Sequence, residues 1–227
     1  QDDYRAGELP GDAAWVLVCD GMGGAKAGGV ASEFASSVFI ENMRSKLRMD
    51  MSVEYISEII SESVAQANIK VYEKSLSDKA YEGMGTTLVS AVLMGKQVVI
   101  GHVGDSRAYL LRPDGITRLT RDHSLVEDMV RMGDITEEEA RNHPNKNLLT
   151  RAIGTTEEEK CDITIQEVND GDFLLLCTDG LSSMVEEQEM LDEVYHGSEK
   201  QEICDRLINI ANSRGGRDNI TVVLIEV

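Results

Sequence analysis

Apolar residues follow two different patterns along the chain. Residues 16–19 and 173–178 are short runs in which almost nothing polar interrupts the apolar side chains, and such runs are typical of strands buried on both faces. Residues 27–47 and 52–76 instead repeat their apolar positions every three or four residues, which indicates two long amphipathic helices. Ser52 suits the start of the second helix, because its hydroxyl can accept a hydrogen bond from a free backbone N–H.

From residue 84 onward the pattern is that of strands joined by short turns. The turns at Gly95-Lys96 and Gly104-Asp105 leave too few residues for a parallel crossover, so neighbouring strands should pair antiparallel. Asp114-Gly115 favours a hairpin. The expected elements of this half are strands at 86–94, 97–103, 106–112, 116–119, 163–168, 172–178 and 220–227, with two more helices at 187–195 and 199–214.

Residues 121–152 differ from their surroundings, because they are polar and contain only short helical pieces at 125–132 and 137–141. We interpret about 122–150 as a surface flap over the strand ends. The order of strands and segregated helix pairs around it predicts an α+β layered sandwich. The 227 residues should form a single domain, 1–227. Because the chain begins at Gln1 without Met, its N-terminal strand is expected to be truncated.

The charge balance narrows the possible partners. Lys and Arg total 22 against 41 Asp and Glu, so the net charge is −19 at pH 7, which argues against nucleic acid or an anionic membrane surface as a partner. No apolar stretch approaches the length of a membrane span. The four cysteines show no paired spacing and indicate free thiols in a reducing compartment. We therefore expect a cytoplasmic protein without a membrane segment.

Four aspartates lie where separate apolar runs end or begin. Asp20, Asp105 and Asp179 each follow such a run, and Asp218 stands just before the last one. Carboxylates that crowd together repel one another unless a cation neutralises them, and hard divalent cations prefer oxygen ligands, including a bare carbonyl such as that of Gly21. These positions predict a site for more than one metal ion. A two-residue hairpin at Asp20-Gly21 is the alternative, although a helical pattern follows it.

Other chemistries that handle phosphate do not match the sequence. A cysteine-based phosphatase needs an Arg about six residues after its nucleophile, but Ser183 occupies that position after Cys177. The glycines at 21–24 match neither a P-loop nor a dinucleotide-binding loop, because Lys26 stands where the latter needs its third glycine. No nucleotide cofactor is therefore expected, and we interpret the glycines as allowing the backbone to approach metal ions closely.

Five short motifs occur in a fixed order along the chain. In this order they resemble the successive motifs of the metal-dependent Ser/Thr protein phosphatases, the protein phosphatase 2C-like family, in its bacterial branch. The resemblance covers essentially the whole chain. It implies a four-layer α-β-β-α sandwich, with two mainly antiparallel sheets flanked by helix pairs and with Mn²⁺ or Mg²⁺ in a cleft at one end. The motifs are Asp20-Gly21-Met22-Gly23-Gly24, Gly85-Thr86-Thr87, Gly104-Asp105-Ser106-Arg107, Asp179-Gly180-Leu181 and Asp218-Asn219.

The resemblance assigns roles to individual residues. Asp20, Asp179 and Asp218 are implied to be catalytic metal ligands, with Asp20 bridging two ions. Gly21 is implied to contribute its backbone carbonyl. These four residues would form the core site.

Three further residues are implied to lie around that core. Asp105 resembles the ligand of a third, weaker metal ion, and Asn147 is expected to assist there. Asp2 is expected to act through a metal-bound water. Two features depart from the family pattern: Met22 stands where eukaryotic members carry a His proposed as the general acid, and the family's phosphate-binding Arg would lie just ahead of Gln1.

The implied activity is hydrolysis of phosphoserine and phosphothreonine by direct attack of a metal-bridging water or hydroxide. The implied partners are phosphorylated proteins, namely substrates of Ser/Thr kinases and the kinase itself, and a monomer is expected. A catalytically silent regulatory or binding module of the same fold is the alternative. A phosphatase for a phosphorylated anti-sigma-factor antagonist is a narrower version of the first hypothesis.

Overall fold

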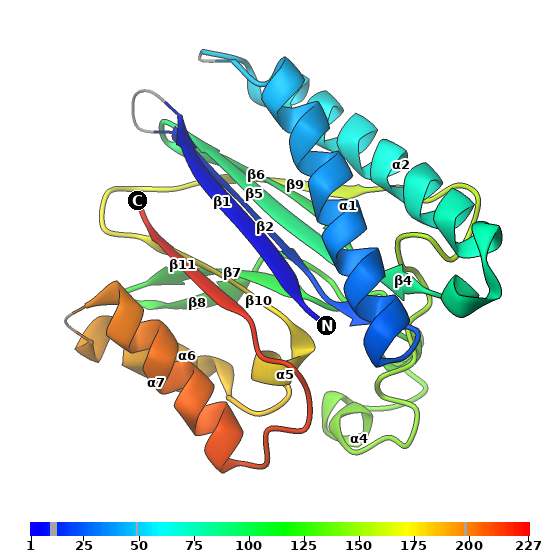
Figure 1. The fold of residues 1–227 in the computed structure, drawn as a ribbon. Coiled ribbons are helices and arrows are strands. Elements are labelled where there is room, and N and C mark those ends of the chain that lie inside the picture. Colours follow the sequence, from blue (N-terminus) through cyan, green and yellow to red (C-terminus); the bar gives the residue numbers. More distant parts are fainter. Residues whose placement is uncertain (10–12, 49, 198) are drawn as a thin grey trace.

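Helices and strands lie in four layers, helix–sheet–sheet–helix, in the computed structural model, which describes residues 1–9, 13–48, 50–197 and 199–227 (Figure 1). Helices α1 (Ala25–Lys46) and α2 (Val53–Ser77) cover the outer face of one sheet. Helices α6 (Glu187–His196) and α7 (Lys200–Ser213) cover the outer face of the other. The expected α+β four-layer sandwich is therefore confirmed. Within the described residues, every helix is too short or too polar to cross a membrane.

All strand pairs are antiparallel, as the short turns predict. The first sheet has the order β1-β2-β5-β6-β9 and the second β11-β10-β7-β8, and a separate ribbon pairs β3 with β4. The strands are β1 (Asp3–Leu9), β2 (Ala13–Cys19), β3 (Gly21–Met22), β4 (Gly85–Thr86), β5 (Leu88–Met94), β6 (Gln97–Val103), β7 (Arg107–Arg112), β8 (Gly115–Arg118), β9 (Asp162–Glu167), β10 (Phe173–Cys177) and β11 (Val222–Glu226).

Alternating residues of β2 belong to two different cores. Trp15, Leu17 and Cys19 pack in the cluster that the first sheet forms with α1 and α2, whereas Val16 and Val18 pack between the two sheets. All five side chains are buried. Because successive side chains of a strand point to opposite faces, a strand covered on both faces needs an uninterrupted apolar run. The run before Asp20 is therefore explained by its central position in the sandwich.

The segment interpreted as a flap contains two short helices, α3 (Leu125–Met132) and α4 (Glu137–Arg141). Ser124 and Thr136 each cap one helix by accepting a hydrogen bond from a backbone N–H of its first turn. An isolated bridge between Ser124 and Leu149 joins the two ends of the segment. The polar sequence thus forms local structure whose helices bury no residue fully.

Several elements were not located from the sequence pattern. Strand β1 pairs with β2 over its whole length, yet it lies at a sheet edge and alternates half-buried with exposed residues. Ribbon β3–β4 joins Gly21 to Thr86, so the chain after Asp20 pairs with a distant segment and the hairpin alternative is wrong. The others are single turns, α5 (Asp179–Ser182) and the 3₁₀ turn η1 (Lys79–Tyr81). Of these elements, the β3–β4 ribbon depends on contacts between residues far apart in the sequence.

The second helix–sheet core can be tested with a Leu-to-Ala substitution in β10. Leu175 is fully buried between β10 and the helices α6 and α7. Leu175→Ala should lower the free energy of unfolding by about 2–5 kcal/mol, because it removes buried apolar contacts and leaves a cavity. Urea unfolding followed by circular dichroism measures this change.

Leu76 provides a matched control, because its side chain is 70% exposed. Leu76→Ala should change the free energy of unfolding by no more than about 0.5 kcal/mol. Equal losses for the two substitutions would contradict the layer assignment.

Candidate metal centre

Most of the predicted site residues meet in one cavity of about 240 Å³, at the point where β2, β6 and β10 end. Asp20, Gly21, Asp105, Asn147, Asp179 and Asp218 line this cavity, and among the seven predicted residues Asp2 does not. The other lining residues are Gln1, Met22, Gly23, Gly24, Thr87 and Leu149. We call this space the acid cavity.

The backbone of Asp20 is held from both sides by a Thr-Thr pair. The Asp20 amide donates to Thr87 Oγ1 (2.9 Å), and its carbonyl accepts from Thr86 Oγ1 and from the Thr87 amide (both 2.8 Å). The backbone amide and carbonyl of Asp20 are therefore hydrogen-bonded without using its own carboxylate. Both threonines therefore support the site through hydrogen bonds to the Asp20 backbone.

Antiparallel pairing of β10 with β11 brings Asp179 and Asp218 to the same end. Cys177, at the end of β10, lies opposite Val222, at the start of β11, so the residues just beyond each strand are neighbours. Gly180 makes this approach possible, because a Cβ there would lie 2.0 Å from the carbonyl oxygen of Asn219. Only glycine lets the two segments come this close.

Asp105 occupies the tight corner between β6 and β7. Gly104 precedes it with a φ of +112°, a conformation that favours glycine, and a Cβ on Gly104 would lie 2.6 Å from the Thr87 side chain. After it, the Ser106 hydroxyl is 2.7 Å from that of Thr87. The corner is thus packed against the same Thr87 that holds Asp20.

Asp2 lies beside the acid cavity and is held by two hydroxyls. Its Oδ2 accepts hydrogen bonds from Thr178 Oγ1 (3.0 Å) and Thr221 Oγ1 (2.7 Å). Its Oδ1 is buried without a hydrogen-bond partner, and so is Oδ1 of Asp179. Buried polar atoms are nearly always paired with protein or water. These two oxygens therefore indicate that further oxygen-binding groups belong at this site.

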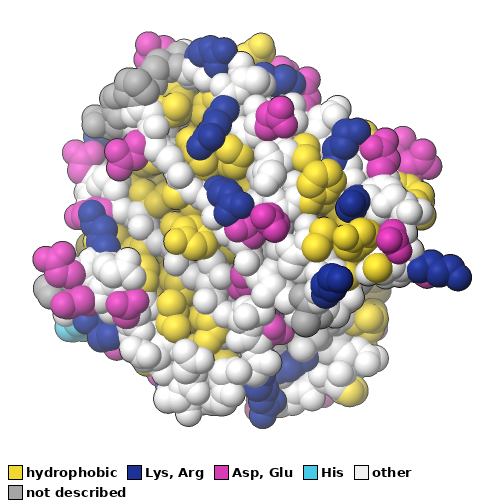
Figure 2. Space-filling model, in the orientation of Figure 1, with side chains coloured by type: hydrophobic (Ala, Val, Ile, Leu, Met, Phe, Trp, Pro, Cys, Tyr) yellow, Lys and Arg dark blue, Asp and Glu magenta, His cyan; other side chains and the backbone are white. Residues whose placement is uncertain are grey.

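Burial and repulsion by neighbouring acids raise the pKa values of Asp20, Asp105 and Asp179. The pKa of Asp20 rises to about 9, mainly because of burial and then because of Asp2, Asp179, Asp105 and Asp218. Burial, followed by Asp179 and Asp122, raises the pKa of Asp105 to about 7. The pKa of Asp179 is raised by burial and by Asp218. Elsewhere, acidic and basic side chains are scattered over the visible surface (Figure 2). The acid cavity differs from that surface, because four aspartates line one small space.

The donor set fits a hard divalent cation better than any other group. It consists of carboxylates, an amide oxygen and a backbone carbonyl, which are the oxygen ligands that Mg²⁺ and Mn²⁺ prefer. Among the described residues, however, no three His, Cys, Asp or Glu side chains are grouped closely enough to hold an ion by themselves. A cation here would need the Gly21 carbonyl, water and some adjustment of the carboxylates.

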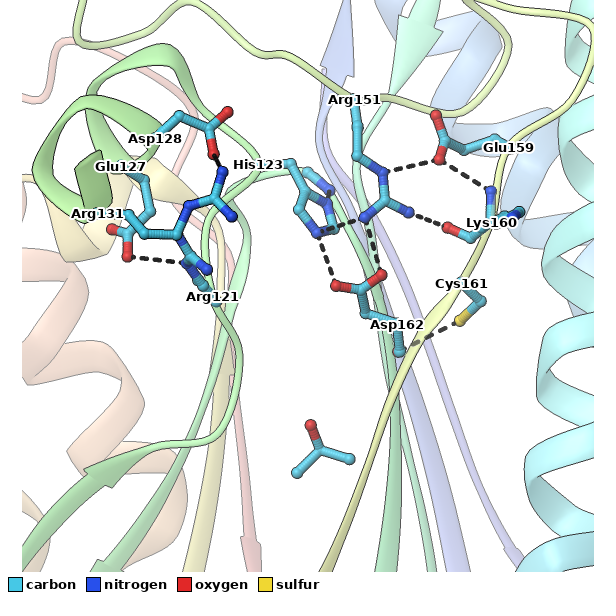
Figure 3. Close-up of polar contacts among 12 residues, drawn as sticks. Arg121, His123, Glu127, Asp128, Arg131, Arg151, Glu159, Lys160, Cys161 and Asp162 are labelled. Carbon is cyan, nitrogen blue, oxygen red and sulfur yellow. Dashed lines mark hydrogen bonds and ion pairs between the residues drawn. The ribbon is translucent and has the colours of Figure 1, made fainter.

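A second cavity, of about 490 Å³, is larger but chemically different. It lies between residues 118–121 and the edge strand β9. Its acids are already paired. Asp162 Oδ1 pairs with Arg151 (2.8 Å) and Glu127 with Arg121 (3.5 Å), as Figure 3 shows, and Glu127 also pairs with Arg118 (3.2 Å). Carboxylates that are paired with Arg do not need a cation. The larger cavity is therefore not the candidate metal site, and the acid cavity is.

Sequence reasoning missed the residues that orient the acids without lining the acid cavity. Thr178 and Thr221, which hold Asp2, gave no signal in a single sequence because threonine is common in strands. Arg107 pairs with Asp122 through contacts of 2.6–3.2 Å. Arg107 could have been suspected, because it follows Gly104-Asp105-Ser106 at the start of a buried strand. Its partner, 15 positions later, could not.

Comparison with known proteins agrees with this geometry. A sequence model described as protein phosphatase 2C matches residues 1–224. A serine/threonine phosphatase of Listeria innocua is 42% identical over 211 residues, which span 93% of this chain and 83% of that protein.

Two solved structures extend the comparison to three dimensions. The serine/threonine phosphatase Stp1 of Staphylococcus aureus superposes with a TM-score of 0.92 at 32% identity, covering 100% of this chain and 88% of that one. The catalytic domain of the protein phosphatase PstP, solved with two manganese ions, gives 0.81 at 30% identity, covering 100% and 97%. With sequence, fold and converging acids in agreement, this chain belongs to the protein phosphatase 2C family, among its bacterial Ser/Thr phosphatases.

Proposed function

We propose that this chain is a Mn²⁺- or Mg²⁺-dependent protein phosphatase that hydrolyses phosphoserine and phosphothreonine by direct attack of water in the acid cavity. The observation that carries the proposal is the convergence of Asp20, Asp105, Asp179 and Asp218 from separate segments on one cavity. The family relationship supports the same reading. When bound, divalent cations at such a site lower the pKa of water toward neutrality and offset charge on the phosphoryl oxygens.

Four residues of the chain would supply the ligands for two core cations. Asp20, Asp179 and Asp218 supply carboxylates, and Gly21 supplies its carbonyl. The contacts with Thr86 and Thr87 fix the position of the Asp20 backbone, from which its carboxylate extends. Asp2 is oriented by Thr178 and Thr221 so that one oxygen stays free, which suits a hydrogen bond to water on a cation.

A third, weaker cation is proposed at Asp105, shared with Asp179. Asn147 reaches the same cavity from the flap, and its amide oxygen is a suitable ligand. Met22 also lines the cavity, but a thioether has no proton to give. The proton for the leaving serine or threonine oxygen therefore has to come from water.

Phosphorylated proteins are the proposed substrates, among them substrates of Ser/Thr kinases and the kinase itself. The flap, about 122–150, borders the acid cavity through Asn147 and Leu149, so it is placed to touch the residues that flank a phosphorylated side chain. A silent binding module is the weaker candidate. Such a module has no use for buried acids that raise one another's pKa values.

Substitution of the core acids tests the proposed site. Asp179→Asn and Asp218→Asn should each lower the Mn²⁺-dependent hydrolysis of p-nitrophenyl phosphate and of a phosphothreonine peptide by at least about 100-fold, because even residues that only orient metal ligands are worth ~10–100-fold. Asp170→Asn is the matched control, since that side chain is 91% exposed. Turnover that persists in a chelator, or unchanged rates in both variants, would reject the proposal.

The raised pKa values predict how pH acts on the metal-free protein. In the unfolded chain Asp20 ionises near its ordinary pKa of 3.8, whereas in the fold its pKa is about 9. Its protonated form thus favours folding at low pH, and this contribution is lost as pH rises toward 9. The melting temperature without metal should therefore fall between pH 5 and pH 9.

Mn²⁺ should reverse this trend, because a cation takes the place of the proton between the carboxylates. Scanning calorimetry should show a larger Mn²⁺-induced rise in melting temperature at pH 8 than at pH 6, and Asp20→Asn should flatten the metal-free profile. A rise that is equal at both pH values in the wild type would argue against competition between protons and cations at these acids.

A further inference from the structure

Two consecutive residues at the start of the flap hold the corner that carries Asp105. On one side of the corner, His123 and Gly104 exchange two hydrogen bonds: the His123 amide donates to the Gly104 carbonyl (2.8 Å), and the Gly104 amide donates to His123 Nδ1 (3.0 Å). On the other side, Asp122 forms a bidentate ion pair with Arg107. Asp105 lies between these two attachments, so its position depends on both.

The hydrogen bond from Gly104 makes His123 Nδ1 an acceptor. Because Nδ1 accepts from a backbone N–H, the proton of the neutral ring is on Nε2. Nε2 lies 3.0 Å from Asp162 Oδ2, which can accept that proton's hydrogen bond. It also lies 2.8 Å from Arg151 Nη1, which donates to the other oxygen of the same carboxylate. The nearly buried ring also stacks on His102 at 4.8 Å. Its orientation is therefore determined at both nitrogens and on one face.

Arg151 holds the outer end of this arrangement, as Figure 3 shows. Its Nη1 donates to Asp162 Oδ1 (2.8 Å), and its Nε donates to Glu159 (2.9 Å). The chain of contacts thus runs from Glu159 through Arg151 and Asp162 to His123 and ends at Gly104. None of these five residues lines the acid cavity.

From these contacts we infer that His123 is a positioning residue, which fixes the Gly104–Asp105 corner and thereby the place of the Asp105 carboxylate in the acid cavity. The inference deepens the proposed function, because it rests on Asp105 holding the weaker cation there. The backbone carbonyl of His123 also accepts a hydrogen bond from the Thr150 amide (2.9 Å). The same residue therefore joins both ends of the flap to the corner.

The test compares variants that keep different halves of the imidazole. Asn at position 123 places an acceptor near the position of Nδ1, so His123→Asn should preserve the contact with Gly104. His123→Gln reaches toward the position of Nε2, so it should preserve only the contact with Asp162. His123→Ala removes both. His196→Ala is the control, since that ring is exposed and, within the described residues, its one hydrogen bond is to the Asp192 carbonyl of its own helix.

Mn²⁺ binding by titration calorimetry is the main readout, with kcat and KM for a phosphothreonine peptide beside it. Asp105→Ala should abolish the weakest binding step. His123→Ala should weaken the same step by about 10–100-fold, the usual effect of losing a group that orients a ligand, while the tighter steps change less than about twofold. His123→Asn should recover most of the loss and His123→Gln little. The double variant with Asp105→Ala should bind no worse than Asp105→Ala alone.

Several results would overturn the inference. One is that the losses of Mn²⁺ affinity caused by His123→Ala and Asp105→Ala add in full in the double variant, and another is that His123→Ala weakens all binding steps equally. The inference also fails if His123→Gln recovers the affinity as well as His123→Asn does, or if the Asp105→Ala isotherm is identical to that of the wild type. If His123→Ala fails to fold in a thermal melt, the comparison of Asn with Gln decides. Failure of the proposed function is distinguishable, because the wild-type chain would then show no Mn²⁺-dependent turnover for Asp179→Asn to abolish.

Discussion

Repulsion between carboxylates in a confined space is the constraint that governs this end of the molecule. Burial alone disfavours the charged form of Asp20, and four neighbouring acids disfavour it further. Strands β2 and β10, which precede Asp20 and Asp179, are buried on both faces, so these two acids cannot separate without disturbing the packed cores. The fold therefore holds the charges together, and a bound proton or cation has to relieve the repulsion.

Hydroxyl groups position these acids with little charge of their own. Thr86 and Thr87 act on the backbone of Asp20, and Thr178 and Thr221 act on one oxygen of Asp2. A neutral hydroxyl orients a carboxylate without neutralising it, whereas an Arg or Lys would remove the negative charge that a cation needs. Arg107 is consistent with this rule, because its guanidinium pairs with Asp122 outside the acid cavity.

The sequence predicted the elements that depend on local pattern and missed those that depend on distant partners. Helix α2 and strand β2 follow from periodicity, and the acids at strand ends follow from the abrupt end of each apolar run. The bounds of strand β1 could not be predicted, because its half-buried positions include Asp3 and Arg5 and so show no apolar alternation. The motif order indicated the cavity residues, but the contacts of Asp2 and His123 join positions that only the folded sheets bring together.

Local charge in the acid cavity, and not the net charge of −19, decides whether a phosphate ester is attracted. Charges on the surface are screened over about 8 Å at physiological ionic strength, whereas the cavity acids line the site itself, where screening by salt is weaker. Each cation gained there changes the field at the phosphoryl group directly. Asp105 is the cavity acid whose position depends on a loop corner, and that corner is hydrogen-bonded to the base of the flap through His123. The base of segment 122–150 and the corner that carries Asp105 are therefore joined through one residue, His123.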